Sequence, residues 1–331
     1  MATNQVLGVR VMLSALLLTV AGCAADPAAP GPSPVANGMP AASKASVAPA
    51  AVGADELGDV PILMYHQLSA DPLGEYDQTP AEFRAELERL YREDYRPVTV
   101  ADYVAGAINI PAGTHPVVLT FDDSTVSQLA FTPDGALVPD TAVAILEDFA
   151  ARHPDFPARA TFYVNNEAFG NAPGALKWLV AHGYEVGSHT ATHANLGQLD
   201  SAGVQREFGE NVREIQTATA SKVHTMALPL GIFPADRALA SQGVWAGVPY
   251  KFDAVMLVGA EPAPSPYGEI DRGGIPRIRS GKGEVAFDSA YWLDRLAASR
   301  YTSDGDPNKI SFPAQRGTEL AASWRDRANP Y

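Results

Sequence analysis

The sequence predicts an α/β fold whose strands form a parallel sheet, either open or closed as a barrel. From residue 59 onward, short runs rich in β-branched and aromatic residues alternate with segments in which apolar residues recur at helical spacing. Strands that alternate with helices are typical of parallel sheets, because a parallel connection needs a long crossover. A length of 331 residues is compatible with one large α/β domain.

About seven strands are predicted, and all of them are short and apolar. They cover residues 61–65, 117–121, 160–164, 185–188, 225–229, 253–258 and 275–278. Five helices are predicted, one that opens at Thr79 and four over 140–151, 173–181, 201–217 and 288–298. The first has a clear start, with Thr79 as N-cap, Pro80 at the first helical position and Glu82 in the first turn.

The charge balance excludes some classes of partner. The net charge is −14 and the sequence pI is about 4.9, whereas a nucleic-acid partner would need a basic face. Broad electrostatic binding to an anionic membrane or polymer is excluded for the same reason. A neutral substrate is compatible with the composition, and no protein partner is indicated.

The N-terminus reads as a targeting segment. Arg10 precedes the apolar run 11–20, which is too short to span a bilayer and fits the core of a secretory signal over 1–23. The run ends in Val-Ala-Gly-Cys, which resembles the lipobox of bacterial lipoproteins, and Cys23 is the only cysteine in the chain. We therefore predict an extracytoplasmic protein held to the cell membrane by a lipid on Cys23. The alternative is a plain signal peptide in which Cys23 is incidental.

Two composition changes divide the chain further. Residues 24–58 are dominated by Ala, Pro, Gly and Ser without apolar periodicity, so we predict a disordered tether there. The folded domain is predicted over 59–331.

Two short strings point to metal chemistry. Residues 120–123 read Thr-Phe-Asp-Asp and follow an apolar run, and residues 188–193 read Ser-His-Thr-Ala-Thr-His. One carboxylate and two imidazoles are a ligand set for a catalytic divalent metal, and the second carboxylate is then free to act as a general base. Each string alone has an ordinary explanation: two aspartates often cap a turn, and two histidines four residues apart can be solvated surface residues. Their combination favours the metal site.

The same residues occupy equivalent places in the predicted sheet. Asp122, His189, Leu230 and His66 each follow a predicted strand directly or within one or two residues. In α/β barrels the active site is built at the carboxyl ends of the strands. Polar residues follow most strands in any case, but four that together compose a metal site and its acid and base indicate a catalytic face.

The order of these motifs resembles that of the polysaccharide deacetylases, carbohydrate esterases with a NodB-type domain. The resemblance rests on Thr-Phe-Asp-Asp, then Ala-Thr-Phe-Tyr-Val at 160–164, then Ser-His-x-x-x-His, and it covers about residues 60–280. It implies a distorted (β/α) barrel that removes acetyl groups from N-acetylated or, less often, O-acetylated sugars. By position, Asp122 resembles the general base. Asp123, His189 and His193 resemble the ligands of one divalent ion, with zinc the expected metal.

One branch of this family is closer. Residues 61–66 read Pro-Ile-Leu-Met-Tyr-His and resemble the opening of circularly permuted, extracellular deacetylases of poly-N-acetylglucosamine. The match implies that His66 is the general acid. The late motif that carries this histidine in unpermuted members is missing, since no histidine follows His224. The alternative is a structural His66.

Two departures leave the substrate open. Near the third motif, where the family often has an arginine or a tyrosine, residues 227–231 read Ala-Leu-Pro-Leu-Gly. The N–H of Leu230 can still serve an oxyanion, because that role needs no side chain. Residues 124–159 form a longer connection than usual, beside the predicted base. The expected substrate is an N-acetylated extracellular or cell-wall polysaccharide. A non-catalytic carbohydrate-binding lipoprotein, and a hydrolase of O-acetyl esters or cyclic amides, remain alternatives.

Overall fold

The structure is a computed structural model that describes residues 47–331. The predicted signal segment, Cys23 and the first part of the predicted tether lie outside the described residues. Within the described part, no helix is both long enough and apolar enough to cross a membrane.

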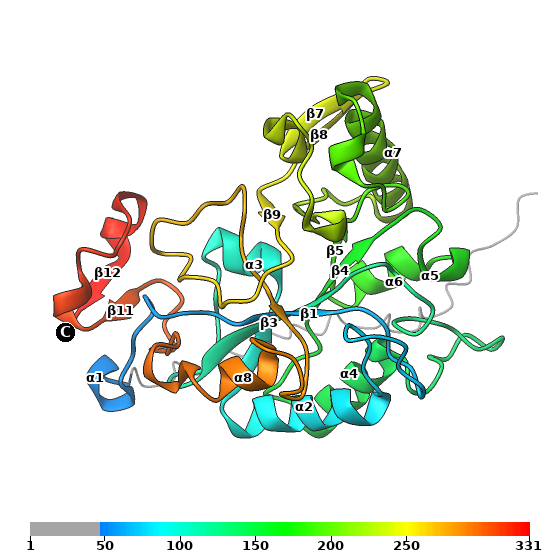
Figure 1. The fold of residues 1–331 in the computed structure, drawn as a ribbon. Coiled ribbons are helices and arrows are strands. Elements are labelled where there is room, and N and C mark those ends of the chain that lie inside the picture. The colour runs from blue at the N-terminus through cyan, green and yellow to red at the C-terminus, as the bar shows by residue number, and fades with distance from the viewer. Residues whose placement is uncertain (1–46) are drawn as a thin grey trace, which may run out of the picture. The chain divides into compact units, whose positions relative to one another are not determined.

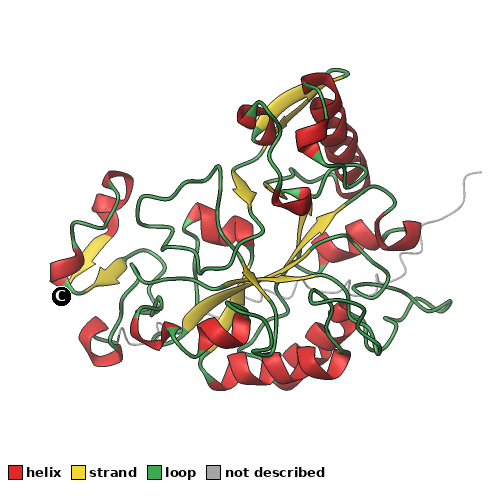
Figure 2. Cartoon of the chain, viewed as in Figure 1, coloured by secondary structure: helices red, strands yellow, loops and turns green. Residues whose placement is uncertain are grey.

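A curled parallel sheet forms the centre of the molecule (Figure 1, Figure 2). The strand order is β10-β1-β3-β4-β5-β6-β9, with β2 paired to the first half of β3, and every pairing is parallel. The strands are β1 (Ile62–Tyr65), β2 (Tyr95–Val98), β3 (His115–Phe121), β4 (Thr161–Val164), β5 (Glu185–Ser188), β6 (Thr225–Ala227), β9 (Ala254–Met256) and β10 (Ile278–Arg279). All seven predicted strands are therefore present, although the last three are shorter than predicted.

The two edges of the sheet meet through a single bridge. Met256 of β9 pairs with Ile275, just before β10, and the N–H of Leu257 donates to the carbonyl of Ile275 at 2.9 Å. Since β10 pairs with β1 on its other side, the sheet closes as a distorted barrel. The predicted fold class is confirmed.

Helices cover the outer face of the sheet. They are α1 (Pro49–Val52), α2 (Pro80–Arg92), α3 (Val100–Ala105), α4 (Ala142–Arg152), α5 (Ala168–Asn171), α6 (Ala175–Ala181), α7 (Ser201–Thr219) and α8 (Ser289–Leu293). Short 3₁₀ helices occupy Leu196–Gln198, Pro229–Gly231, Arg237–Ala240, Leu296–Ala298, Ala314–Arg316 and Ala322–Arg327. The predicted N-cap at Thr79 is present and is part of a capping box, because the side chains of Thr79 and Glu82 accept each other's backbone N–H groups. The helix predicted over 288–298 is wrong beyond Leu293, where the chain turns and continues as a 3₁₀ helix.

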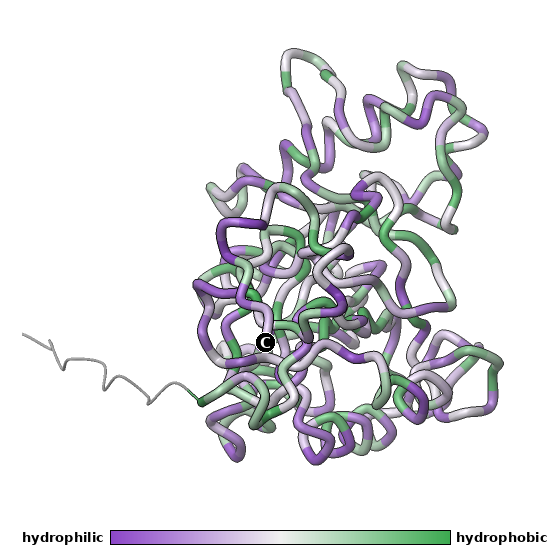
Figure 3. Tube along the Cα trace, turned by 90° about the vertical axis from the view of Figure 1, so that its left-hand side faces the viewer, coloured by the Kyte–Doolittle hydropathy of each residue, from purple (hydrophilic) through white to green (hydrophobic). Residues whose placement is uncertain are grey.

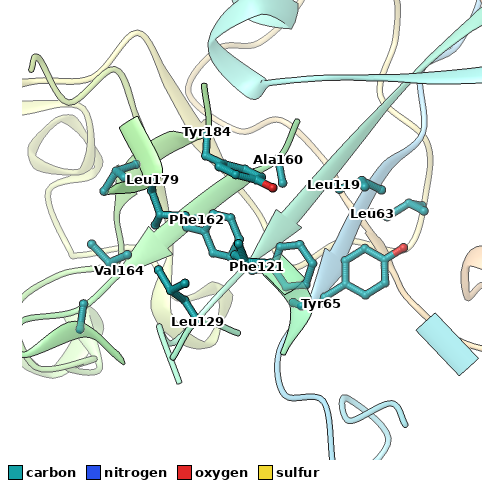
Figure 4. Packing of buried hydrophobic residues seen from close by; sticks show 14 of the residues in the cluster. Leu63, Tyr65, Leu119, Phe121, Leu129, Ala160, Phe162, Val164, Leu179 and Tyr184 are labelled. Atoms are coloured by element: carbon teal, nitrogen blue, oxygen red, sulfur yellow. The ribbon is translucent and has the colours of Figure 1, made fainter. Parts of the chain in front are cut away.

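An aromatic layer lies under the helices at the carboxyl end of the sheet. Tyr65, Phe121 and Phe162 occupy paired positions on three neighbouring strands and stack with ring centroids 5.0 Å apart (Figure 4). Hydrophobic segments run through the centre of the chain trace (Figure 3). Side chains alternate along a strand, so the residues after these aromatics turn to the opposite face, into the barrel. His66 and Asp122 are two of them.

The sequence reading missed two small β-units. One is a hairpin of β7 (Gln242–Trp245) and β8 (Val248–Lys251), which packs on α7. Gly209 of α7 permits this contact, since a Cβ there would lie 2.4 Å from the Cβ of Trp245. The other unit pairs β11 (Ile310–Phe312) with β12 (Ala328–Pro330).

Residues 47–58 belong to the folded body, so the predicted boundary at 58/59 is wrong. Ala54, Glu56 and Leu57 are buried. The carboxylate of Glu56 accepts hydrogen bonds from the Tyr301 hydroxyl at 2.9 Å and from the Ser311 N–H at 2.8 Å. These partners lie some 250 residues away, which explains why the local Ala and Pro composition gave no sign of the packing.

Glu56 generates a prediction about stability and pH. Burial is the main cause that raises the pKa of Glu56 to about 7, against the hydrogen bond from Ser311 that lowers it. Between about pH 4.5 and 7 the folded state keeps a proton that the unfolded state has lost, so this stabilising contribution is complete below pH 4.5 and is lost as the pH rises through 7. We expect the free energy of unfolding of the parent, relative to Glu56→Gln, to fall by about 3 kcal/mol across this window.

Urea denaturation at pH 4.5 to 8 measures this difference, with Glu88→Gln on the exposed face of α2 as the control. A parent-minus-variant difference that does not change with pH contradicts the prediction.

Candidate active site

The two aspartates at the end of β3 have different surroundings. Asp122 is 1% exposed and lies on the barrel side of the strand, whereas the side chain of Asp123 is 33% exposed. Asp123 takes a left-handed backbone conformation with a φ of 74°, a strained state that a non-glycine residue keeps only when its surroundings impose it. The turn at Asp123 places both carboxylates at the carboxyl end of the barrel.

The two histidines approach Asp123 from the end of β5. The Nε2 atoms of His189 and His193 each lie 3.4 Å from Oδ1 of Asp123. The Nδ1 atom of His189 is 2.8 Å from the carbonyl oxygen of Ala227, which fixes the ring so that Nε2 is free to bind a metal. Thr190 and His193 also have positive φ angles, of 65° and 55°. The predicted triad is thus brought together.

The three residues fit a divalent metal ion. Their potential ligand atoms all lie within 4.8 Å of one another. Zinc binds histidine nitrogen at about 2.0–2.1 Å in tetrahedral sites, which puts neighbouring ligand atoms about 3.4 Å apart. Oδ1 of Asp123 is buried and has no hydrogen-bond partner among residues 47–331, a costly state unless a cation balances it. The spacing and this orphaned oxygen support the predicted ligands.

Arg277 is a site residue that the sequence reading did not identify. It lies just before β10, is fully buried, and its Nη1 and Nη2 atoms each donate to one oxygen of Asp122 at 2.7 Å. Further bonds run from Nη1 to the Thr120 hydroxyl at 3.0 Å and from Nε to the Leu257 carbonyl at 2.8 Å. An arginine within the apolar run 275–278 was the available signal, since such a residue is almost never buried without a partner.

The Arg277 ion pair sets the charge of Asp122. Burial alone would raise the pKa of Asp122, but the nearby Arg277 guanidinium and, less strongly, His189 hold it well below its usual range. Asp122 is therefore ionised throughout the neutral range, as a proton acceptor must be.

His66 follows β1 and lies beside these carboxylates. Its ring packs against Tyr76 at a centroid distance of 4.9 Å, and Nδ1 is buried with no hydrogen-bond partner in the described chain. Burial lowers the pKa of His66, while the charges of Asp122 and Asp123 act in the opposite direction. The position is compatible with the predicted acid.

The long connection after Asp123 supports the site. Nε2 of Gln128 donates to the carbonyl oxygens of both His66 and Asp122, at 2.8 and 2.5 Å. The hydroxyl of Ser127 accepts the N–H of Leu68 at 3.1 Å. The start of the 124–159 segment therefore ties the end of β1 to the end of β3, a role that the sequence reading left open.

Leu230 lies beyond the end of β6, in the 3₁₀ helix Pro229–Gly231. Its φ is 59° and its side chain is 57% exposed. The carbonyl of Ala227, which orients His189, is only three residues away. The predicted oxyanion role of the Leu230 N–H stays a prediction.

Part of the chain is similar to known proteins. Residues 109–244 match the family model described as polysaccharide deacetylase. Over 126 residues the chain is 32% identical to a chitooligosaccharide deacetylase of Bradyrhizobium sp. (strain ANU 289), a match that covers 38% of this chain and 50% of the relative. The chain thus spans about half the length of this curated relative.

Solved structures of low sequence identity share the fold. The deacetylase PplD of Streptococcus pyogenes, solved with acetate, matches with a TM-score of 0.54 and 19% identity over 71% of this chain and 97% of that one. IcaB from Ammonifex degensii matches with a TM-score of 0.51 and 19% identity over 72% of this chain and 96% of that one. These likenesses agree with the distorted barrel described above.

The ligand assignment predicts metal loss in single variants. Asp123→Ala and His189→Ala each remove one of only three protein ligands, so zinc content after dialysis should fall to a small fraction of the parent's. Elemental analysis measures it, with His224→Ala as a control histidine outside the site. Full zinc occupancy in either ligand variant would show that these residues are not the ligands.

The buried ion pair predicts a large and correctable loss of stability. Arg277→Met leaves the Asp122 charge buried without a partner, which should lower the free energy of unfolding by about 3–5 kcal/mol. The double variant Asp122→Asn/Arg277→Met removes that charge and should recover a large part of the loss. Urea denaturation in the presence of a chelator measures both. Equal instability of the single and double variants would contradict the assignment of the loss to an unpaired charge.

Proposed function

We propose that the chain is a metal-dependent hydrolase of N-acetylated polysaccharides, because residues 109–244 match the polysaccharide deacetylase family model and the fold is that of a distorted barrel. The substrate we propose is an extracellular or cell-wall polymer, from which the enzyme removes N-acetyl groups. The observation that carries the proposal is the meeting of Asp122, Asp123, His189 and His193 at one end of the barrel.

The proposed roles follow from the chemistry of each group. A divalent ion held by Asp123, His189 and His193 would supply a Lewis acid that activates water and polarises the acetyl carbonyl. Asp122, kept ionised by Arg277, accepts the proton of the attacking water. The N–H of Leu230 donates to the developing oxyanion.

His66 is the proposed proton donor to the leaving amine. An amine is a poor leaving group until it is protonated, so cleavage of an amide needs an acid at this place. Because burial favours the neutral imidazole at rest, the proton must reach His66 within the reaction. Asp122 and Asp123 are the carboxylates whose charges act on His66.

Arg277 weakens the case for a non-catalytic relative. The altered third motif was the feature that suggested loss of activity, because the arginine often found there was missing. Here a guanidinium reaches the proposed base from the strand beside β1 instead. The proposed base is therefore held ionised and oriented by a guanidinium. An O-acetyl esterase is the second candidate. The observation in its favour is Leu230, which stands where the family often has an aromatic residue.

Parallel assays on an amide and an ester test the proposal and the role of His66. The zinc-loaded parent should release acetate from an N-acetylglucosamine tetramer, and a chelator should stop it. His66→Ala should keep its zinc and lose about 10²–10⁴-fold on the tetramer, the usual range for acid catalysis. It should lose clearly less on an aryl acetate, whose leaving group departs as a stable anion.

Asp122→Asn is the contrasting variant, because it should impair both substrates through water activation. No acetate release from the tetramer by the parent would overturn the proposed N-deacetylase. Tetramer turnover by His66→Ala within a few-fold of the parent would make His66 structural.

We also propose that the protein is lipid-anchored through Cys23. The support is the Val-Ala-Gly-Cys string behind an apolar run and the lack of any second cysteine. In bacterial cells, the Cys23→Ser protein should be absent from the membrane fraction. Its rate of acetate release per molecule should equal that of the parent. Ala21→Gly, which keeps a small residue in the string, should fractionate as the parent does. A Cys23→Ser protein that remains with the membranes to the parent's extent would refute the anchor.

A further inference from the structure

A cavity lies beside the His66 edge of the site. It has a volume of about 340 Å³, within the range of roughly 300–1,000 Å³ typical of ligand sites. Two segments that are distant in the sequence enclose it, 72–82 and 280–288. Both segments also contact the chain on either side of His66: the N–H of Gln78 donates to the Gln67 carbonyl, and the N–H of Ser280 donates to the Met64 carbonyl.

One layer of side chains separates the cavity from His66. The ring centroids of His66 and Tyr76 lie 4.9 Å apart. The guanidinium of Arg279 lies over the Tyr76 ring, 5.1 Å from its centroid. Arg279 in turn pairs with Glu75 at 2.6 Å, and Glu75 lines the cavity. The cavity is therefore a neighbour of the His66 edge of the site.

The lining is strongly acidic. Its five carboxylates belong to Glu75, Asp77, Glu82, Glu284 and Asp288, against one lysine, Lys282, and the adjoining Arg279. Lys282 lies 2.6 Å from Glu82 and 3.7 Å from Glu284, and Arg279 lies 2.6 Å from Glu75. Five carboxylates against two cations leave a net charge of −3 around this space.

Two buried acceptors in the lining have no partner. Ser280 is 2% exposed and Gln78 is 7% exposed. The hydroxyl oxygen of Ser280 and Oε1 of Gln78 make no hydrogen bond within residues 47–331. Buried polar atoms of this kind are normally satisfied, so a ligand with donors is the natural complement.

The lining does not suit a metal ion. In the described chain, the group of three acidic or histidine residues whose atoms converge within 4.8 Å is Asp123, His189 and His193, and none of the five carboxylates belongs to it. Dispersed negative charge with neutral acceptors between instead fits an organic ammonium, which has three donors and one positive charge.

We propose that this cavity is a subsite for a glucosamine unit of the polymer, a sugar that has already lost its acetyl group. The inference rests on the proposed function, because glucosamine is the product of that reaction. Its consequence is a preference for N-acetyl groups next to sites that are already deacetylated. Deacetylation would then spread along the polymer from the first sugars that lose their acetyl groups.

Oligosaccharides of defined acetylation test the subsite with the full, zinc-loaded chain. The substrates are the fully acetylated N-acetylglucosamine tetramer and two tetramers with one glucosamine, at either end. We expect one of the latter to have a kcat/KM about tenfold higher, the size expected of one charge-assisted hydrogen bond. This advantage should shrink in 0.5 M NaCl, because salt screens the attraction.

Ser280→Ala and Glu284→Gln should reduce the advantage several-fold and leave turnover of the fully acetylated tetramer within about twofold. Asp148→Asn is the matched control, because it removes a similarly exposed carboxylate on α4, away from the cavity. Equal rates on all tetramers, or an advantage unchanged in both cavity variants, would overturn the subsite and leave the proposed function standing.

A failure of the proposed function would look different. In that case none of the tetramers releases acetate, and the subsite is judged by binding instead. In calorimetric titration, the glucosamine tetramer should then bind more tightly than the N-acetylglucosamine tetramer. Ser280→Ala should weaken the binding of the glucosamine tetramer. Equal binding of both tetramers, or none, would overturn the subsite.

Discussion

The ion pair between Arg277 and Asp122 is the interaction on which the site and the closure of the barrel both depend. Both side chains are buried, and two charges removed from water are stable there only with excellent mutual geometry. The two 2.7 Å bonds and the additional bonds to Thr120 and Leu257 provide it. Arg277 lies just before β10 and Asp122 just after β3, with β1 between these two strands. The pair therefore joins the strands at the seam where the sheet closes, and it fixes the charge of the proposed base.

The stacked aromatic layer beside this pair supports the strained turns that follow the strands. The stacked Tyr65, Phe121 and Phe162 fix the strand ends from the helix side, and the residues that follow turn inward as strand alternation requires. Positive φ angles at Asp123, Thr190 and His193 let the two loops after β3 and β5 converge on one point. Gln128 ties the end of β3 to the loop after β1, because it donates to the carbonyl groups of Asp122 and His66. Preorganisation of this kind suits a metal site, because ligands that are already in place need not be ordered when the ion binds.

The sequence predicted the parts of the site that are encoded locally. Asp122, Asp123, His189 and His193 stand in short strings behind apolar strands, so pattern and spacing were enough to find them. Arg277 was missed because its partner is 155 residues away and nothing in the neighbouring apolar residues marks it. Residues 47–58 were missed for the same reason, since their Ala-rich composition hides contacts with residues 300–311. The strands were predicted well because each is an apolar run, whereas β2 contains Arg96 and Pro97 and the hairpin lies outside the central sheet.

The packing of residues 47–58 also determines where the described chain enters the barrel. This segment leads into β1 from the amino end of that strand and is fastened to the chain's last third by Glu56 and Asp55. The reactive groups stand at the carboxyl ends of the strands, at the opposite pole of the barrel. The entry of the described chain and the reactive groups are therefore separated by the length of the strands, so this segment packs tightly without crowding the site.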